Sequence, residues 1–237
     1  MQTTRGILIW VGVLVGTGCS GADKVEAGTS EAEITNGRAT SRFPAVSELV
    51  INDNQWCTAT LITPSVVLTA AHCVHYTNAT IGIWYDGVWY DADHWNWHGG
   101  YDPNTGNVAG LAGNVDIAVV HLATPVVGVT PMPLADVMPE SDDAFRMVGY
   151  GESYAGEGVY RTKRIAAAVV GTTYPSWFAG TGGSSPCHGD SGGPAIDASG
   201  RIIGVFARMR TDCAGGPDGF SYVTVAPLRS WIATHAQ

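Results

Sequence analysis

The chain has 237 residues, of which 45% are hydrophobic and 14% charged, so it has enough apolar material for one large domain or two small ones with cores of their own. Its 31 glycines and 12 prolines are scattered, which favours many turns and short strands over long helices. A formal net charge of −9 argues against a nucleic-acid partner, because phosphate binding depends on clustered Lys and Arg.

Residues 1–18 have the pattern of an export signal. Arg5 precedes an apolar run over residues 6–18, which is too short to span a bilayer and fits the core of a signal peptide. Small residues before Cys19 are similar to a bacterial lipoprotein signal, although Gly16 stands where that signal usually has Leu. We therefore expect a protein that is secreted or anchored to a bacterial cell envelope. Cys19 is either lipidated and holds the chain to a membrane, or it is lost by cleavage nearby or left as an unused thiol.

Residues 19–33 carry small and charged side chains with almost no apolar bulk. Such a segment cannot bury enough surface to fold alone, which predicts a linker or propeptide. From residue 34 to residue 237 the composition is that of a globular protein. One folded unit is therefore expected over residues 34–237.

Short stretches rich in β-branched and aromatic residues follow one another in this unit, separated by Gly, Pro, Asn and Asp, which predicts an all-β barrel or sandwich. The predicted strands are Ala45–Ile51, Cys57–Ile62, Val66–Leu68, Thr80–Trp84, Ile117–Leu122, Phe145–Gly149, Ile165–Val170, Ile202–Phe206 and Ser221–Val225. The segment Asp86–Asn114 is rich in Trp, Gly and Asn and is expected to form extended surface loops. Only Ala226–Ala236 is predicted to be helical, because its apolar residues fall on one face and Pro227 is tolerated in a first turn.

The string CHGDSGGP over residues 187–194 is the strongest chemical signal in the sequence. A serine hydroxyl becomes a useful nucleophile when a base takes its proton and backbone donors receive the resulting oxyanion. Gly189 leaves a backbone N–H free to face a substrate carbonyl, and the two glycines after Ser191 permit a tight turn that holds the hydroxyl at the rim of a cleft. Ser191 is therefore the candidate nucleophile, with the N–H groups of Gly189 and Ser191 as the oxyanion donors.

The base must come from elsewhere in the chain. His72, in TAAHC over residues 69–73, directly follows an apolar strand-like run and is the candidate. Asp116, at the start of the apolar run NVDIAVVHL, is expected to be partly buried, where a carboxylate persists only if it is paired or hydrogen-bonded. It would accept the Nδ1–H of His72 and stabilise the imidazolium.

TAAHC, DIAVVHL and GDSGGP, in this order, resemble the trypsin and chymotrypsin family of serine peptidases over about 200 residues, from Ile34 to the C-terminal helix. The resemblance implies two antiparallel six-stranded β-barrels with a C-terminal α-helix and a cleft between the barrels. It also implies that His72, Asp116 and Ser191 form a catalytic triad acting on a polypeptide substrate without a cofactor or a metal. We expect a monomer.

Five cysteines are present, and four remain if Cys19 is set aside. Four cysteines allow three pairings, so their spacing alone does not fix the disulfides. The resemblance implies Cys57–Cys73 beside the base and Cys187–Cys213 beside the nucleophile. Disulfides also indicate an oxidising compartment, in agreement with an export signal.

The resemblance further implies a zymogen in which cleavage before Ile34 frees an ammonium group that pairs with Asp190. The sequence ITNGRATSRFPAVSEL fits such a start, but Glu33 stands where the family often has Arg or Lys. The activator is therefore expected to be a protease without trypsin-like specificity, or the enzyme itself.

The resemblance places Ser185 at the base of the primary specificity pocket, Phe206 to Arg210 along its far wall and Phe220 near its floor. Ser185 stands in place of the Asp that would attract Lys or Arg, so the chain is not expected to be Lys/Arg-specific. One alternative is a preference for small or medium apolar residues. The other is an acidic preference set by Arg208, Arg210 and His188, which would make Glu33 a self-processing site.

Two other functions of the whole chain are also considered. One is a binding protein without turnover, and the other is an esterase that acts on small esters.

Overall fold

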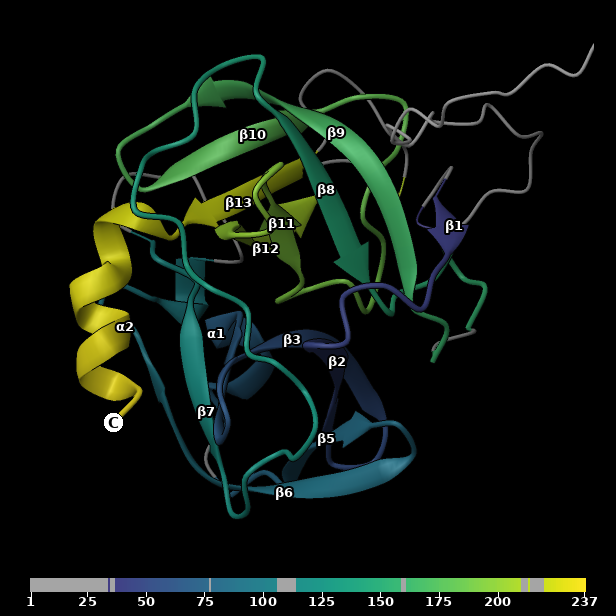
Figure 1. The fold of residues 1–237 in the computed structure, drawn as a ribbon, viewed down its shortest axis with the longest axis vertical. Helices are drawn as coiled ribbons and strands as arrows, with labels where there is room; N and C mark the ends of the chain where they lie inside the picture. Colours follow the sequence, from purple (N-terminus) through teal and green to yellow (C-terminus); the bar gives the residue numbers. More distant parts are fainter. Residues whose placement is uncertain are drawn as a thin grey trace, which may run out of the picture.

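The computed structural model describes residues 34, 37–76, 78–105, 114–158, 161–209, 213 and 220–237. In this part of the chain the strands form two closed antiparallel barrels of six strands each, drawn one above the other in Figure 1. The predicted signal peptide and propeptide, Cys19 and Glu33 lie outside the described residues. Both barrels and the C-terminal helix confirm the fold class expected from the sequence.

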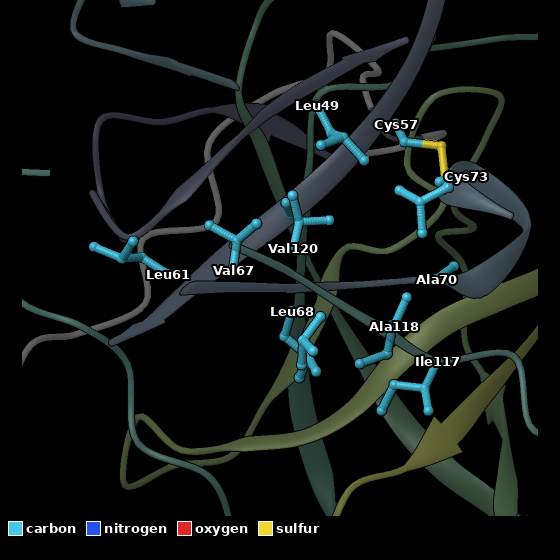
Figure 2. Packing of buried hydrophobic residues seen from close by; sticks show 14 of the residues in the cluster. Leu49, Cys57, Leu61, Val67, Leu68, Ala70, Cys73, Ile117, Ala118 and Val120 are labelled. Carbon is cyan, nitrogen blue, oxygen red and sulfur yellow. A yellow bond between two sulfur atoms is a disulfide. The ribbon is translucent and has the colours of Figure 1, made fainter. Parts of the chain in front are cut away.

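The first barrel is built from residues 46–122 and closes in the order β2-β3-β4-β7-β6-β5. Its strands are β2 (Val46–Ile51), β3 (Gln55–Thr63), β4 (Val66–Thr69), β5 (Ile81–Tyr85), β6 (Val88–Trp97) and β7 (Ala118–Leu122). Aliphatic side chains from these strands fill the interior (Figure 2). The one-turn helix α1 (Ala71–Val74) directly follows β4, and the 3-10 helix η1 (Pro103–Thr105) follows β6.

The second barrel closes in the order β8-β9-β10-β13-β12-β11, and the short strand β1 (Arg38–Ala39) pairs with the first two residues of β9. Its strands are β8 (Ala144–Gly149), β9 (Arg164–Thr173), β10 (Trp177–Thr181), β11 (Pro194–Ile196), β12 (Ile202–Met209) and β13 (Phe220–Thr224). Its core is more aromatic than that of the first barrel, because the rings of Phe145, Phe178 and Phe206 gather around Tyr222. Every predicted strand corresponds to a strand of one of the two barrels.

The segment predicted as surface loops is in part a strand. β6 occupies ten residues of it and pairs with β5 on one side and β7 on the other. A register shift between Ala92 and His94 breaks the alternation of inward and outward side chains. The sequence of β6 therefore lacks the alternation of apolar and polar residues by which a strand is predicted. The turn into β6 has both Asp86 (φ 46°) and Gly87 (φ 78°) in the left-handed region, as a tight two-residue hairpin requires. β1, β10 and β11 were also not predicted.

The C-terminal segment is helical, as predicted. It begins as a 3-10 turn, η2 (Ala226–Leu228), and continues as α2 (Arg229–His235). The helix leaves the second barrel after β13 but lies beside β7 of the first (Figure 1), where the Nε2–H of His121 donates to the carbonyl oxygen of His235 at 2.7 Å. Ile232, on the same helix, is buried. Among the described residues no helix is both long and apolar enough to cross a membrane.

Candidate active site

His72 and Asp116 meet because β4 and β7 are neighbours. Thr69 at the end of β4 pairs with Ala118 at the start of β7, so α1 begins directly beside the segment that carries Asp116. The Asp116 Oδ2 atom lies 2.7 Å from Nδ1 of His72, and Oδ1 accepts the backbone N–H of His72 at 2.9 Å. Asp116 is only 1% exposed. This two-point contact fixes the ring, and with its Nδ1–H given to Asp116 the neutral imidazole presents Nε2 as a proton acceptor.

The loop that carries Ser191 is anchored to both barrels. The backbone N–H of Thr58, in β3, donates to the carbonyl oxygen of Ser191 at 2.7 Å. The Thr58 hydroxyl donates to the carbonyl oxygen of Gly189 at 2.9 Å, and the N–H of Gly192 donates to the carbonyl oxygen of Phe206, in β12, at 2.8 Å. The sulfur of Cys73, the residue after His72, lies 3.9 Å from the Ser191 carbonyl oxygen. The nucleophile loop and the His72 helix are therefore in contact.

Two glycines in this loop, Gly189 and Gly192, have backbone angles that strain other residues, and neighbouring atoms leave no room for a side chain on Gly192. Gly189 and Gly192 have φ of 93° and 83°, in the left-handed region where a side chain is strained. A Cβ on Gly192 would lie 2.1 Å from the hydroxyl oxygen of Thr69. Within the described residues, no backbone hydrogen bond takes up the N–H of Gly189 or of Ser191. This agrees with their expected role as oxyanion donors, which remains a prediction.

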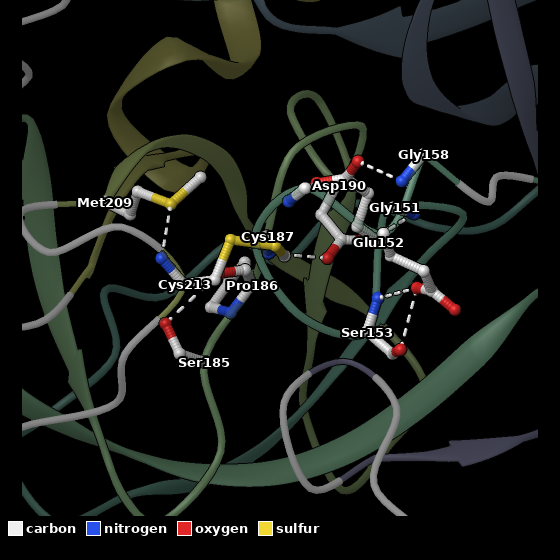
Figure 3. Close-up of a disulfide and its surroundings, with 12 residues drawn as sticks. Gly151, Glu152, Ser153, Gly158, Ser185, Pro186, Cys187, Asp190, Met209 and Cys213 are labelled. Atoms are coloured by element: carbon white, nitrogen blue, oxygen red, sulfur yellow. Dashed lines mark hydrogen bonds between the residues drawn. A yellow bond between two sulfur atoms is a disulfide. The ribbon is translucent and has the colours of Figure 1, made fainter.

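Asp190 is buried beside the segment that follows β8 of the second barrel. Its carboxylate oxygens accept the N–H groups of Gly151 and Cys187, each at 2.8 Å (Figure 3). Burial raises the pKa of this carboxyl to about 6, while the two backbone donors and the Arg164 guanidinium act in the opposite direction. Ile34 is 1% exposed and lines a small cavity together with Asp190. The two residues of the expected activation pair are therefore close to one another.

The residues expected around the specificity pocket belong to the second barrel. Ser185 is fully buried, and its hydroxyl donates to the carbonyl oxygen of Pro186 at 3.1 Å. The ring of Phe220 packs against Gly180, where an added Cβ would lie 1.9 Å from it. Phe206 is buried in the aromatic core, and Arg208 is half-buried on β12. Arg210 lies outside the described residues.

Both disulfides implied by the sequence resemblance are confirmed: Cys57–Cys73 and Cys187–Cys213. The first joins β3 to α1 next to His72, and the second holds the start of the nucleophile loop (Figure 3). His72 also lies within 4.8 Å of the two sulfurs of the first disulfide, but bonded sulfurs do not offer thiolate ligands to a metal. Two disulfides fit an extracellular protein.

Two residues of this region went unnoticed in the sequence. Thr58 joins the barrels, because its hydroxyl donates to Gly189 and accepts the N–H of Tyr150 at 3.1 Å. Arg164, in β9, is 2% exposed and has the largest side chain among the fully buried residues. A threonine in an apolar strand and an arginine at a strand end carry no local signal of such roles.

Comparison with known proteins agrees with this geometry. The family model described as Trypsin matches residues 33–232. The chain is 27% identical to Trypsin beta of Drosophila erecta, covering 87% of this chain and 89% of that one, and 26% identical to Trypsin alpha-4 of Lucilia cuprina, covering 87% and 88%. Among solved structures, it is similar to neuropsin, a serine protease expressed in the limbic system of mouse brain (TM-score 0.72, 20% identity, 85% of this chain and 99% of that one). It is also similar to human heparin binding protein (TM-score 0.69, 23% identity, 84% and 94%). The chain belongs to the trypsin family and is a serine-type endopeptidase.

Proposed function

We propose that this endopeptidase cleaves peptide bonds through an acyl-enzyme on Ser191, with His72 as general base and acid and Asp116 as the residue that orients it. The observation that carries the proposal is the two-point contact of Asp116 with His72, beside the loop of Ser191. A buried carboxylate that holds one imidazole tautomer is what a serine needs to become nucleophilic.

In the first half of the reaction the Ser191 hydroxyl oxygen attacks the carbonyl carbon of the substrate and its proton passes to Nε2 of His72. The negative charge that develops on the carbonyl oxygen is met by the N–H groups of Gly189 and Ser191. His72 then gives the proton to the leaving amine as the C–N bond breaks. A water molecule attacks the ester in the same way, with His72 again taking the proton, and Ser191 is regenerated.

Activation is proposed to follow cleavage before Ile34. The new ammonium group would form an ion pair with the Asp190 carboxylate, which is buried and close to Ile34. A buried carboxylate gains from such a partner, because burial disfavours its charged form more than the two backbone donors and Arg164 favour it. Since Glu33 precedes the bond, the activating protease is proposed not to be Lys/Arg-specific.

The primary specificity is proposed to favour small or medium apolar residues and to exclude Lys and Arg. Ser185 carries no charge and is fully buried, so this position supplies no carboxylate to attract a basic side chain. An acidic preference set by Arg208, Arg210 and His188 is the competing possibility. Arg208 is half-buried on β12, the strand expected to form the far wall, and His188 is exposed. A peptide panel that varies the residue before the cut separates the two: cleavage after Ala, Val or Leu but not after Glu or Asp supports the apolar preference.

The central experiment is labelling of the processed chain with a fluorophosphonate, which reacts with an activated serine. Labelling at Ser191 is expected, and the Ser191→Ala variant and the His72→Ala variant should stay unlabelled. A folded, processed chain that stays unlabelled would refute the proposal and favour a binding protein on the same fold. If esters turn over but matched amides do not, the chain is an esterase.

A separate measurement, the intact mass of the mature protein, reports its N-terminus and any lipid on Cys19.

A further inference from the structure

Arg164 is a cation enclosed in the second barrel. It begins β9, its side chain is 2% exposed, and its Nη1 donates to the carbonyl oxygen of Gly151 at 2.7 Å. A guanidinium removed from water is costly unless anions and hydrogen-bond acceptors surround it. The groups around Arg164 therefore indicate which negative charges it balances.

Two carboxylates interact with this cation, those of Glu157 and Asp190. Glu157 Oε1 is 4.0 Å from Nη2 of Arg164, and the buried Glu152 holds the same loop by accepting the N–H groups of Gly156 and Gly158. The second carboxylate is that of Asp190, whose pKa the Arg164 guanidinium lowers against the larger, opposite effect of burial. One buried cation thus acts on two acids, so a second positive charge beside Asp190 would be favourable.

Gly151 connects Arg164 to Asp190. Its carbonyl oxygen receives the guanidinium, and its own N–H donates to Oδ1 of Asp190 at 2.8 Å. The absence of a side chain is essential at this position, because a Cβ on Gly151 would lie 2.6 Å from the carboxyl carbon of Asp190. Arg164 therefore fixes the backbone donor that holds Asp190, and Asp190 precedes the nucleophile directly.

We propose that Arg164 is a positioning residue that keeps Asp190, and with it the oxyanion donors of Gly189 and Ser191, in place while Ile34 is still joined to Glu33. In the uncut chain the nitrogen of Ile34 is part of a peptide bond and carries no charge. Among the described residues, the cation that acts on the Asp190 carboxylate is then Arg164. In contrast to the inactive zymogen expected from the sequence, the uncut protease should have basal activity, and the new ammonium should increase this activity instead of creating it. The inference rests on the proposed acyl-enzyme mechanism and activation.

The test compares fluorophosphonate labelling rates of the uncut chain and of the chain that begins at Ile34, with each form verified by intact mass. Wild-type uncut chain should label at Ser191 at a measurable rate. In Arg164→Gln the uncut chain should label roughly tenfold to a hundredfold more slowly, the scale of losing one buried charge partner, while the cut chain should lose only a few-fold. Arg164→Lys, which keeps the charge, should restore most of the rate. Arg201→Gln, which removes a half-exposed arginine paired with Asp136 and Asp197, is the matched control and should change neither form.

The outcomes separate this inference from the proposed function. If the cut wild-type chain does not label, the acyl-enzyme proposal fails. If it labels but the uncut wild-type chain does not, or if Arg164→Gln slows both forms equally, Arg164 has only a structural role. Should Arg164→Gln not fold, Arg164→Lys decides: a rate for its uncut chain that falls more than tenfold overturns the inference, and a rate close to wild type supports it.

Discussion

Replacing Asp116 by Asn tests the role of the carboxylate without changing its size. In the structure Oδ1 accepts the backbone N–H of His72 and Oδ2 faces its Nδ1 at 2.7 Å. The amide oxygen of Asn can keep the first contact only by turning its NH₂ group toward Nδ1. Nδ1 must then act as an acceptor, so the ring carries its proton on Nε2 and cannot take one from Ser191. A wrong tautomer of this kind lowers kcat about 10⁴-fold, equivalent to about 5 kcal/mol of transition-state stabilisation.

The assay is kcat for a cleaved peptide substrate, with circular dichroism and thermal unfolding to show that the variant is folded. Asp93→Asn offers a matched control, because Asp93 Oδ2 also lies 2.8 Å from a histidine Nδ1, that of His94, but both side chains are more than half exposed. This control should leave kcat unchanged. If Asp116→Asn keeps its fold and loses less than tenfold in kcat, the assigned role of Asp116 is wrong.

Three further predictions follow from the same region. The raised pKa of Asp190 means that this carboxyl binds its proton more tightly in the folded uncut chain than in the unfolded chain. The free energy of unfolding should therefore fall by about 3 kcal/mol as the pH rises from below 4 to above 6. Urea titrations across that range should show a smaller fall for the chain in which the ammonium of Ile34 is free. Gly192→Ala should destabilise the fold by more than 2 kcal/mol and abolish labelling, whereas Gly87→Ala, with a similar φ but open space around it, should cost only about 1 kcal/mol. Thr58→Val leaves the buried carbonyl of Gly189 and the N–H of Tyr150 without their partner and should cost about 1–3 kcal/mol of unfolding free energy with a lower kcat. Thr60→Val removes a buried hydroxyl that has no hydrogen-bond partner in the described part of the chain, and it should be neutral or stabilising.

These predictions also have outcomes that would contradict them. Equal pH dependence of unfolding in the uncut and cut chains would show that Asp190 gains no partner from cleavage. Equal effects of Gly192→Ala and Gly87→Ala would show that the space around Gly192 is not tight. A Thr58→Val variant as stable and as active as wild type would mean that the link between the barrels is made elsewhere.

Much of the fold could be predicted because its signals are local. The strands that were found are short runs of β-branched residues ended by turn residues, and the loop of Ser191 is a single continuous string. β6 escaped because the irregular register at Ala92 and His94 disturbs the alternation on which strand prediction depends.

Other features depend on closure of the barrels. Thr58 and Arg164 acquire their roles only when β3 meets the nucleophile loop and β9 meets the segment after β8, and no neighbouring residue in the sequence announces those contacts. Arg164 in particular contradicts the usual expectation that an arginine is exposed. The position of Ile34 beside Asp190 is likewise a product of tertiary folding.

The path of α2 has a consequence for how the molecule melts. The helix is covalently continuous with one barrel and docked on the other, through Ile232 and the His121–His235 contact. Loss of either barrel removes the support of the helix and so weakens the remaining one. Heating should therefore give one calorimetric transition whose van't Hoff and calorimetric enthalpies agree, as for a single cooperative unit, and not two separate steps.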